Sequence, residues 1–172
     1  IAVAREKGIV VQEVDRSKLD SMCESHGHQG VIALAAIRDY VDVDHMLEEA
    51  EARGEAPFII ILDGIKDGYN LGSILRTSDA VGAHGVVIPK RRAVGLTPVV
   101  AKASAGAVEY VPVARVTNIV QTIDYFKSRN IWVVGTDLSG GQAFYEADLT
   151  GPIALVIGSE GEGMSRLTAE KC

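Results

Sequence analysis

The fold of this chain is decided by two apolar runs that stand far apart, Phe58-Ile59-Ile60-Ile61-Leu62 and Ile153-Ala154-Leu155-Val156-Ile157. Neither run contains a polar side chain, and this pattern is typical of strands that are buried on both faces of a parallel sheet. Between them, the apolar segments 85–88, 110–113 and 131–135 predict three further strands.

Helical patterns separate these strands. Residues 70–81, 97–105 and 118–129 each have the spacing of an amphipathic helix, and the pair Thr97-Pro98 supplies a cap followed by proline at the first helical position. Strands that alternate with helices in this way predict an α/β fold, an open and mostly parallel sheet with helices on both faces.

Residues 1–56 lack the regular alternation of strands and helices found after residue 57. Residues 9–11 and 31–35 predict short strands, and residues 16–25 predict a helix. A segment of this size cannot bury a core alone, so we interpret residues 1–36 as the C-terminal part of a small α/β domain. Residues 37–56 are interpreted as an acidic linker with a short helix, and residues 57–172 as the main domain, incomplete at its C-terminal end.

The net charge of −6 is unevenly distributed among the 172 residues. Residues 1–56 hold 6 basic and 12 acidic side chains, whereas residues 66–115 hold seven basic and three acidic ones. The middle of the chain can therefore contact nucleic acid, although ordinary solvated charge is the alternative. No apolar stretch is long enough to span a membrane, and the two cysteines suggest neither a disulfide framework nor a metal site. We expect a cytoplasmic protein without a metal.

Ligands of open parallel sheets bind beyond the carboxyl ends of the strands. Residues 158–163, Gly-Ser-Glu-Gly-Glu-Gly, follow the last strand and either form a plain tight turn or let the backbone approach a ligand closely. Their glycine order is neither that of a dinucleotide-binding loop nor that of a phosphate-binding P-loop. Asn70, if it caps its helix, would point into the same cleft; Arg76, six residues later, faces the cleft or the solvent.

Taken together, these motifs resemble the SpoU/TrmH family of RNA 2'-O-methyltransferases, and within it the branch that methylates guanosine in bacterial 23S rRNA. Residues 63–77 are similar to the family's first motif, with Gly68 where proline is usual, and residues 155–164 are similar to its second. The third motif, which in the family completes a deep trefoil knot and the cofactor pocket, does not occur in residues 1–172. We therefore expect these residues to fold around the sheet but to bind S-adenosylmethionine weakly.

The resemblance implies that residues 1–36 are the C-terminal part of an N-terminal domain that binds the RNA substrate, and it implies a role for each part of the site. S-adenosylmethionine would bind near Gly135, Thr136, Gly158, Ser159, Gly161 and Gly163. Arg76 would stabilise the developing alkoxide of a ribose 2'-hydroxyl, Asn70 would position the ribose, and Glu160 would orient one of them. RNA phosphates would contact Lys90, Arg91, Arg92, Lys102 and Arg115. The sulfonium drives the transfer, so no metal is needed, and the family works as a homodimer.

Other functions stay open. The scaffold could bind rRNA without catalysis, and within the family the substrate could be tRNA or the rRNA target of an antibiotic. A nucleotide-binding oxidoreductase is disfavoured because residues 63–72 lack its glycine pattern.

Overall fold

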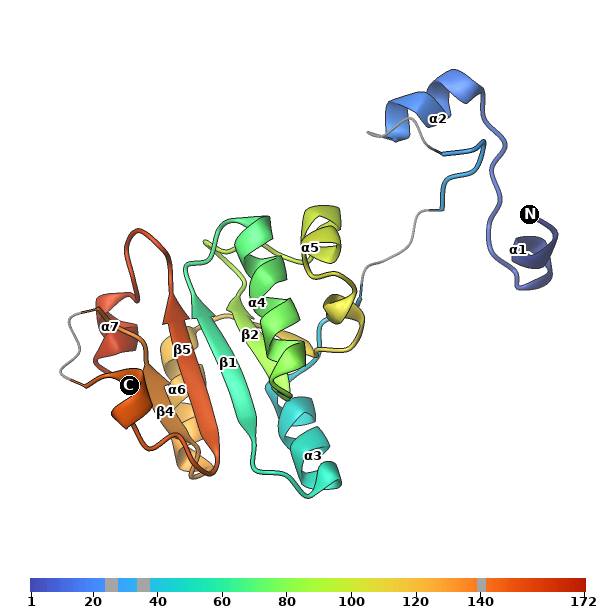
Figure 1. The fold of residues 1–172 in the computed structure, drawn as a ribbon. Coiled ribbons are helices and arrows are strands. Elements are labelled where there is room, and N and C mark those ends of the chain that lie inside the picture. Colours follow the sequence, from blue (N-terminus) through green and yellow to red (C-terminus); the bar gives the residue numbers. More distant parts are fainter. Residues whose placement is uncertain (24–27, 34–37, 139–141) are drawn as a thin grey trace. The chain divides into compact units, whose positions relative to one another are not determined.

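The computed structural model describes residues 1–23, 28–33, 38–138 and 142–172 and divides the chain into two compact units, Ile1–Ala36 and Ile37–Cys172 (Figure 1). Within the described residues of the first unit there are two short helices, α1 (Ala2–Glu6) and α2 (Arg16–Met22). No helix in the described ranges is both long and apolar enough to cross a membrane.

The strands predicted in the first unit are absent from its described residues. Residues 9–11 and 31–33 are irregular, and residues 34 and 35 lie outside the described ranges. Val10 is 93% exposed, and no strand lies beside it among the described residues of the first unit. For residues 9–11 the prediction was wrong, because an apolar run forms a stable strand only where a partner strand is at hand.

The second unit is built on five parallel strands in the order β3-β2-β1-β5-β4. Their bounds are β1 (Phe58–Asp63), β2 (Gly85–Pro89), β3 (Val113–Val116), β4 (Trp132–Gly135) and β5 (Ile153–Gly158). The predicted open parallel sheet is confirmed. The two runs that open the sequence analysis are its central pair, with Ile59 opposite Ala154 and Asp63 opposite Gly158.

Helices cover both faces of this sheet (Figure 1). On one face lie α4 (Gly68–Ala80), α5 (Pro98–Ala103) and the short 3-10 turn η1 (Ala107–Glu109); on the other lie α3 (Val43–Arg53) and α6 (Ile119–Ser128). The chain also forms the 3-10 turn η2 (Phe144–Glu146) before β5 and the short helix α7 (Arg166–Ala169) after it.

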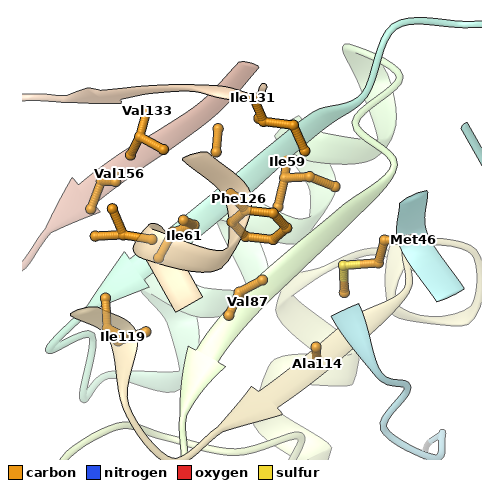
Figure 2. Close-up of a cluster of buried hydrophobic side chains, with 12 residues drawn as sticks. Met46, Ile59, Ile61, Val87, Ala114, Ile119, Phe126, Ile131, Val133 and Val156 are labelled. Atoms are coloured by element: carbon orange, nitrogen blue, oxygen red, sulfur yellow. The ribbon is translucent and has the colours of Figure 1, made fainter. Parts of the chain in front are cut away.

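Alternate residues of each strand serve the two cores. In β1, Ile59 and Ile61 face the side of α3 and α6, whereas Ile60 and Leu62 face α4 and α5. Figure 2 shows the first of these clusters, with Phe126 of α6 packed against Ile59 and Ile61. Because successive side chains of a strand point to opposite faces, a strand between two helical layers must be apolar throughout.

The acidic segment 37–56 contributes to the core through α3. Met46 and Ala50 of α3 are fully buried, while the acidic side chains lie on its outer face. Gly85 of β2 makes room for this helix, since a Cβ there would lie 2.3 Å from the Met46 sulfur. The helix was predicted; its place in the core was not.

One predicted strand is displaced. The structure places residues 107–109 in η1 and starts β3 at Val113, three residues later than the predicted strand at 110–113. Val113 pairs with Val86, so the start of β3 is set by its register on β2 rather than by the apolar run itself.

Candidate functional site

The carboxyl ends of all five strands meet at one edge of the sheet, and the candidate residues gather there. Asp63 and Gly158 pair as the last residues of β1 and β5. The chain leaves β1 toward β2 and enters β5 from β4, so these neighbouring strands diverge at a topological switch point. A crevice at such a point is the expected ligand site of an open α/β sheet.

The glycine-rich segment forms a closed loop after β5. Ser159 and Gly163 exchange two backbone hydrogen bonds of 2.9 Å, and Gly163 has a positive φ of 67°. A Cβ on Gly158 would lie 2.2 Å from the Gly163 carbonyl carbon, so this closure requires glycine at 158. Gly161, by contrast, has open space around it. The loop is therefore tight at its base and unconstrained at its tip.

Two contacts attach this loop to the end of β1. The Ser165 N–H donates to the Asp63 carboxylate at 2.8 Å, and the Lys66 ammonium lies 4.0 Å from the Glu162 carboxylate. Both partners of the second contact are well exposed, so it contributes little. Asp63 was not predicted as an anchor, because its partner Ser165 lies 102 residues away in sequence. Its position at the end of an otherwise apolar strand was the available signal.

A small hollow of about 250 Å3, called here the β1–β5 hollow, lies between these two loops. It is lined by Gly64, Ile65, Lys66, Asp67, Asn70, Ser159, Glu160, Gly161 and Glu162. The structure thus brings Asn70 and Glu160, predicted from distant motifs, to one site.

Asn70 reaches this hollow without capping its helix. The cap of α4 is Asp67, whose carboxylate accepts the Asn70 backbone N–H at 2.9 Å. The helix begins at Gly68, so the prediction that it starts with Asn70 was wrong. Gly68 occupies the first helical position, where the family's usual proline would also fit. Among the described residues, the Asn70 side-chain amide has no hydrogen-bond partner and is available to a ligand.

Arg76 does not line the β1–β5 hollow. It is exposed on α4, about 9 Å farther along the helix axis than Asn70 at 1.5 Å per residue. Its guanidinium has no ion pair within the described part of the chain. Side chains of a helix lean toward its N-terminus, which in α4 is the end at the hollow.

A larger hollow of about 930 Å3, called here the β4 hollow, runs along the edge strand β4 from its start to its carboxyl end. It is lined by Asn130, Trp132, Val133, Val134, Gly135, Asp137, Gln142, Glu146, Ala147, Asp148, Thr150, Pro152, Met164, Ala169 and Cys172. A Cβ on Gly135 would lie 2.7 Å from the Met164 methyl carbon, so glycine keeps this wall open.

The polar groups of the β4 hollow are partly committed. Thr136, which lies next to the lining residue Gly135, donates both its N–H and its hydroxyl to the Val156 carbonyl, at 3.0 and 3.1 Å, so neither donor is free for a ligand. The Cys172 thiol donates to the Thr168 carbonyl at 3.2 Å. Burial raises the pKa of the Cys172 thiol, with Asp63 acting in the same direction and Lys127 opposing it.

The hollows on the two sides of the glycine loop are the candidate sites for S-adenosylmethionine. The β4 hollow lies within the usual size range of small-molecule sites and combines apolar groups such as Val133 and Met164 with polar ones. Gly135 and Gly158, both in the predicted cofactor region, are packed so closely that a Cβ would clash, against the Met164 and Cys172 side chains at Gly135 and against the backbone of Gly163 and Met164 at Gly158. Across the described ranges, no group of three or more His, Cys, Asp or Glu side chains is arranged to hold a metal ion.

The predicted RNA-contacting residues do not form one group. Lys90, Arg91 and Arg92 are exposed directly after β2, at the same sheet edge as both hollows. Arg115 lies on β3, where its guanidinium is 4.9 Å from the centre of the Tyr40 ring and donates to the Lys90 carbonyl. Lys102 is exposed on α5.

The tight glycine loop and Asn70 line one hollow at the switch point of a parallel sheet, as in ligand-binding α/β domains. Comparison with known families identifies the class of this domain. Residues 57–172 match the model of the SpoU rRNA methylase family, and residues 1–41 match that of the substrate-binding domain of RNA 2'-O ribose methyltransferases. The chain belongs to the SpoU rRNA methylase family, a class of RNA methyltransferases that use S-adenosylmethionine.

Individual relatives agree with this assignment. A Bacillus subtilis protein, YacO, named for the TrmH family of tRNA/rRNA methyltransferases, is 56% identical over 100% of this chain and 69% of its own length. A solved structure from Porphyromonas gingivalis, described as of the TrmH family, is 39% identical, with a TM-score of 0.62 over 67% of this chain and 47% of that one. The SpoU methyltransferase AviRb of Streptomyces viridochromogenes, solved with its cofactor AdoMet, is 29% identical, with a TM-score of 0.67 over 76% and 49%. The chain thus spans about half the length of these solved structures.

Proposed function

We propose that the whole protein transfers a methyl group from S-adenosylmethionine to a ribose 2'-hydroxyl of RNA, and that the target is a guanosine of 23S rRNA. The protein would act in the cytoplasm as a homodimer. One observation carries the reaction type: residues 57–172 match the methylase family, and within them Asn70 and Glu160 meet in the β1–β5 hollow.

In the proposed mechanism the β1–β5 hollow receives the ribose. The Asn70 amide would hydrogen-bond the ribose, and Glu160, on the opposite wall, would orient that amide or Arg76. Arg76 would lean toward the hollow from α4 and stabilise the charge that develops on the 2'-oxygen. A guanidinium stays protonated, so Arg76 serves as an electrostatic group rather than as a base.

The cofactor would occupy the β4 hollow and the base of the glycine loop, held by Gly135, Gly158, Ser159 and Gly163, with Gly161 at the loop tip. Thr136 would contribute its carbonyl oxygen, because its two donors are already used. When bound, S-adenosylmethionine supplies an electrophilic methyl group on a positively charged sulfur. That methyl group would be available to the ribose 2'-oxygen beside Asn70 and Arg76, with the hydroxyl proton passing to solvent and the sulfur left as a neutral thioether.

RNA phosphates would contact the exposed cations at the same edge, Lys90, Arg91 and Arg92, with Lys102 and Arg115 as further candidates. The local excess of basic residues supports this, as does the match of residues 1–41 to an RNA-substrate-binding domain.

The target nucleotide is best tested by mapping 2'-O-methyl groups in rRNA and tRNA from a deletion strain and from the same strain complemented by the gene. A single 23S rRNA guanosine that loses its methyl group and regains it supports the proposal. Loss confined to tRNA would instead favour a tRNA enzyme, which the joint tRNA/rRNA naming of the Bacillus relative leaves open. No change in either RNA, together with retained rRNA binding, would favour a non-catalytic role.

A further inference from the structure

The loop between β2 and α5, residues 90–97 and called here the basic loop, carries three of the exposed cations but little regular structure. Arg92 has a positive φ of 59°, which is uncommon for a residue with a side chain. A loop that must be ordered when it binds loses affinity to conformational entropy. The contacts that hold it before RNA arrives therefore affect how well it binds.

Two backbone hydrogen bonds attach the basic loop to the sheet edge. The Lys90 N–H donates to the Val116 carbonyl at 2.8 Å, and the Val94 N–H donates to the Ile65 carbonyl at 3.0 Å. Ile65 also lines the β1–β5 hollow, so the basic loop and the proposed ribose site share a wall.

Two side chains complete the attachment. The Tyr40 hydroxyl accepts the Leu96 N–H at 2.8 Å, and the Arg115 guanidinium, over the Tyr40 ring, donates to the Lys90 carbonyl at 3.2 Å. Gly95 allows the approach, since a Cβ there would lie 2.8 Å from the Tyr40 hydroxyl. The two ends of the basic loop are thus held by one stacked pair.

Tyr40 itself is held against the edge of the sheet. The next residue, Val41, forms a parallel bridge with Ala114 and donates its N–H to the Val113 carbonyl at 2.9 Å. Arg38 donates to the Glu109 carbonyl at 2.7 Å. The segment that carries Tyr40 is therefore fixed to β3 independently of the basic loop.

We propose that Tyr40 and Arg115 form a clasp that presents Lys90, Arg91 and Arg92 to RNA phosphates. Tyr40 is then a positioning residue for RNA binding, although it is uncharged and lies outside residues 57–172, the methylase match. Arg115 acts mainly through the clasp, because one face of its guanidinium is stacked and one nitrogen is already hydrogen-bonded. This inference rests on the proposed function.

Salt titration of RNA binding tests the clasp, with the whole protein and in-vitro transcribed 23S rRNA as the probe. Each lost phosphate contact lowers the slope of log affinity against log salt by about 0.7–0.9. Tyr40→Ala removes no charge, yet we expect it to lower that slope by about 0.7–1.8, the loss of one or two contacts, and to weaken binding about ten-fold at low salt. It should raise KM for RNA and leave kcat at saturating RNA unchanged.

Two matched variants separate the parts of the clasp. Tyr40→Phe keeps the stacked ring and loses only the acceptor for Leu96, so its effect should be smaller. Tyr110→Ala removes a tyrosine that lies just before β3, is more exposed than Tyr40 and makes no contact with the basic loop among the described residues, so it should leave the slope unchanged. In all variants, limited trypsin digestion reports whether cleavage after Arg91 and Arg92 becomes faster, as expected for Tyr40→Ala.

An unchanged slope together with unchanged trypsin cleavage in Tyr40→Ala would overturn the clasp. If that variant does not fold, faster trypsin cleavage in the folded Tyr40→Phe protein still supports it, and unchanged cleavage overturns it. If the unaltered protein does not bind rRNA at all, the proposed function fails, while the trypsin result still decides whether Tyr40 holds the loop.

Discussion

The β1–β5 hollow lies at the carboxyl edge of the sheet, and the β4 hollow runs along the edge strand β4 to the same edge; the two differ in size and in lining. The β1–β5 hollow is small, and most of its side chains are polar or charged, including Lys66, Asn70 and Glu160. The β4 hollow is almost four times larger and includes apolar walls, with Gly135 and Met164 close together. One has the character of a ribose site, and the other that of a site for a larger, partly apolar ligand.

The same loop borders both hollows. Ser159 to Glu162 line the β1–β5 hollow, and Met164, two residues later, lines the β4 hollow. The closure between Ser159 and Gly163 sets where both walls lie. A change at the base of the loop should therefore affect both sites, whereas a change on one wall should affect only its own.

Gly158→Ala should have the broadest effect, on both hollows and on stability, because its Cβ would lie 2.2 Å from backbone atoms of Gly163 and Met164. The loop must reopen, and we expect methyl transfer and cofactor affinity each to fall about 100-fold, with about 1–3 kcal/mol lost from the free energy of unfolding. Enzyme assay, calorimetry and denaturant unfolding measure the three quantities.

Gly161→Ala is the matched control for that substitution. Gly161 has open space around it and no positive φ, so its alanine variant should bind cofactor and unfold like the unaltered protein. Equal damage from both substitutions would mean that the loop needs general flexibility rather than the closure at Gly158.

Arg76→Ala tests whether the two hollows are functionally separate. Loss of a preorganised charge at the reacting oxygen should lower kcat about 100- to 1000-fold, while cofactor affinity stays within about a few-fold, since Arg76 lines neither hollow. Arg53→Ala, on the remote helix α3, should leave both unchanged. An equal fall in cofactor affinity and turnover for Arg76→Ala would contradict its assignment to the ribose.

Gly135→Ala tests the β4 hollow, which Gly135 lines. The new methyl group would lie 2.7 Å from the end of the flexible Met164 side chain, which can move only into the β4 hollow or against its surroundings. We expect cofactor affinity to fall about ten-fold, with kcat at saturating cofactor unchanged. Adding Met164→Ala should restore part of the affinity; no restoration would show that the loss does not come from this contact.

The smallest expected effect concerns the Cys172 thiol. Burial raises its pKa, so less of it is the reactive thiolate near neutral pH, and alkylation by iodoacetamide should be slower than for an unperturbed thiol. The rate should rise with pH and level off only above the usual range. S-adenosylmethionine should slow it further if it occupies the β4 hollow, and mass spectrometry, with Cys23 as internal reference, would show equal rates if it does not.

Local patterns predicted most of the sheet but not the details of the site. The runs at 58–62 and 153–157 specify buried strands by their composition alone, because both faces must be apolar. The helix at 118–129 was predicted from its amphipathic spacing, with Thr117 as its candidate cap; the structure makes Asn118 the cap instead, with its side chain accepting the Gln121 N–H.

Features that depend on distant partners were missed. The Asp63 anchor to Ser165 and the contact of Tyr40 with Leu96 join residues that no local pattern relates. The assignment of the cap of α4 to Asn70 instead of Asp67 has another cause, because both residue types favour caps and lie three positions apart. Only the dihedral angles of the folded chain decide between them.

The pairing of β1 with β5 has a consequence for how the protein is made. Ile59 of β1 is opposite Ala154 of β5, so β1 is synthesised 95 residues before the strand that pairs with it. At about 5–20 residues per second, the ribosome needs about 5–20 seconds to supply it. During that time β1 can pair only with β2, and its other edge stays open to intermolecular pairing. The nascent chain should therefore depend on chaperones most strongly just before β5 emerges, and ribosome profiling of chaperone-bound chains would reveal whether binding ends there.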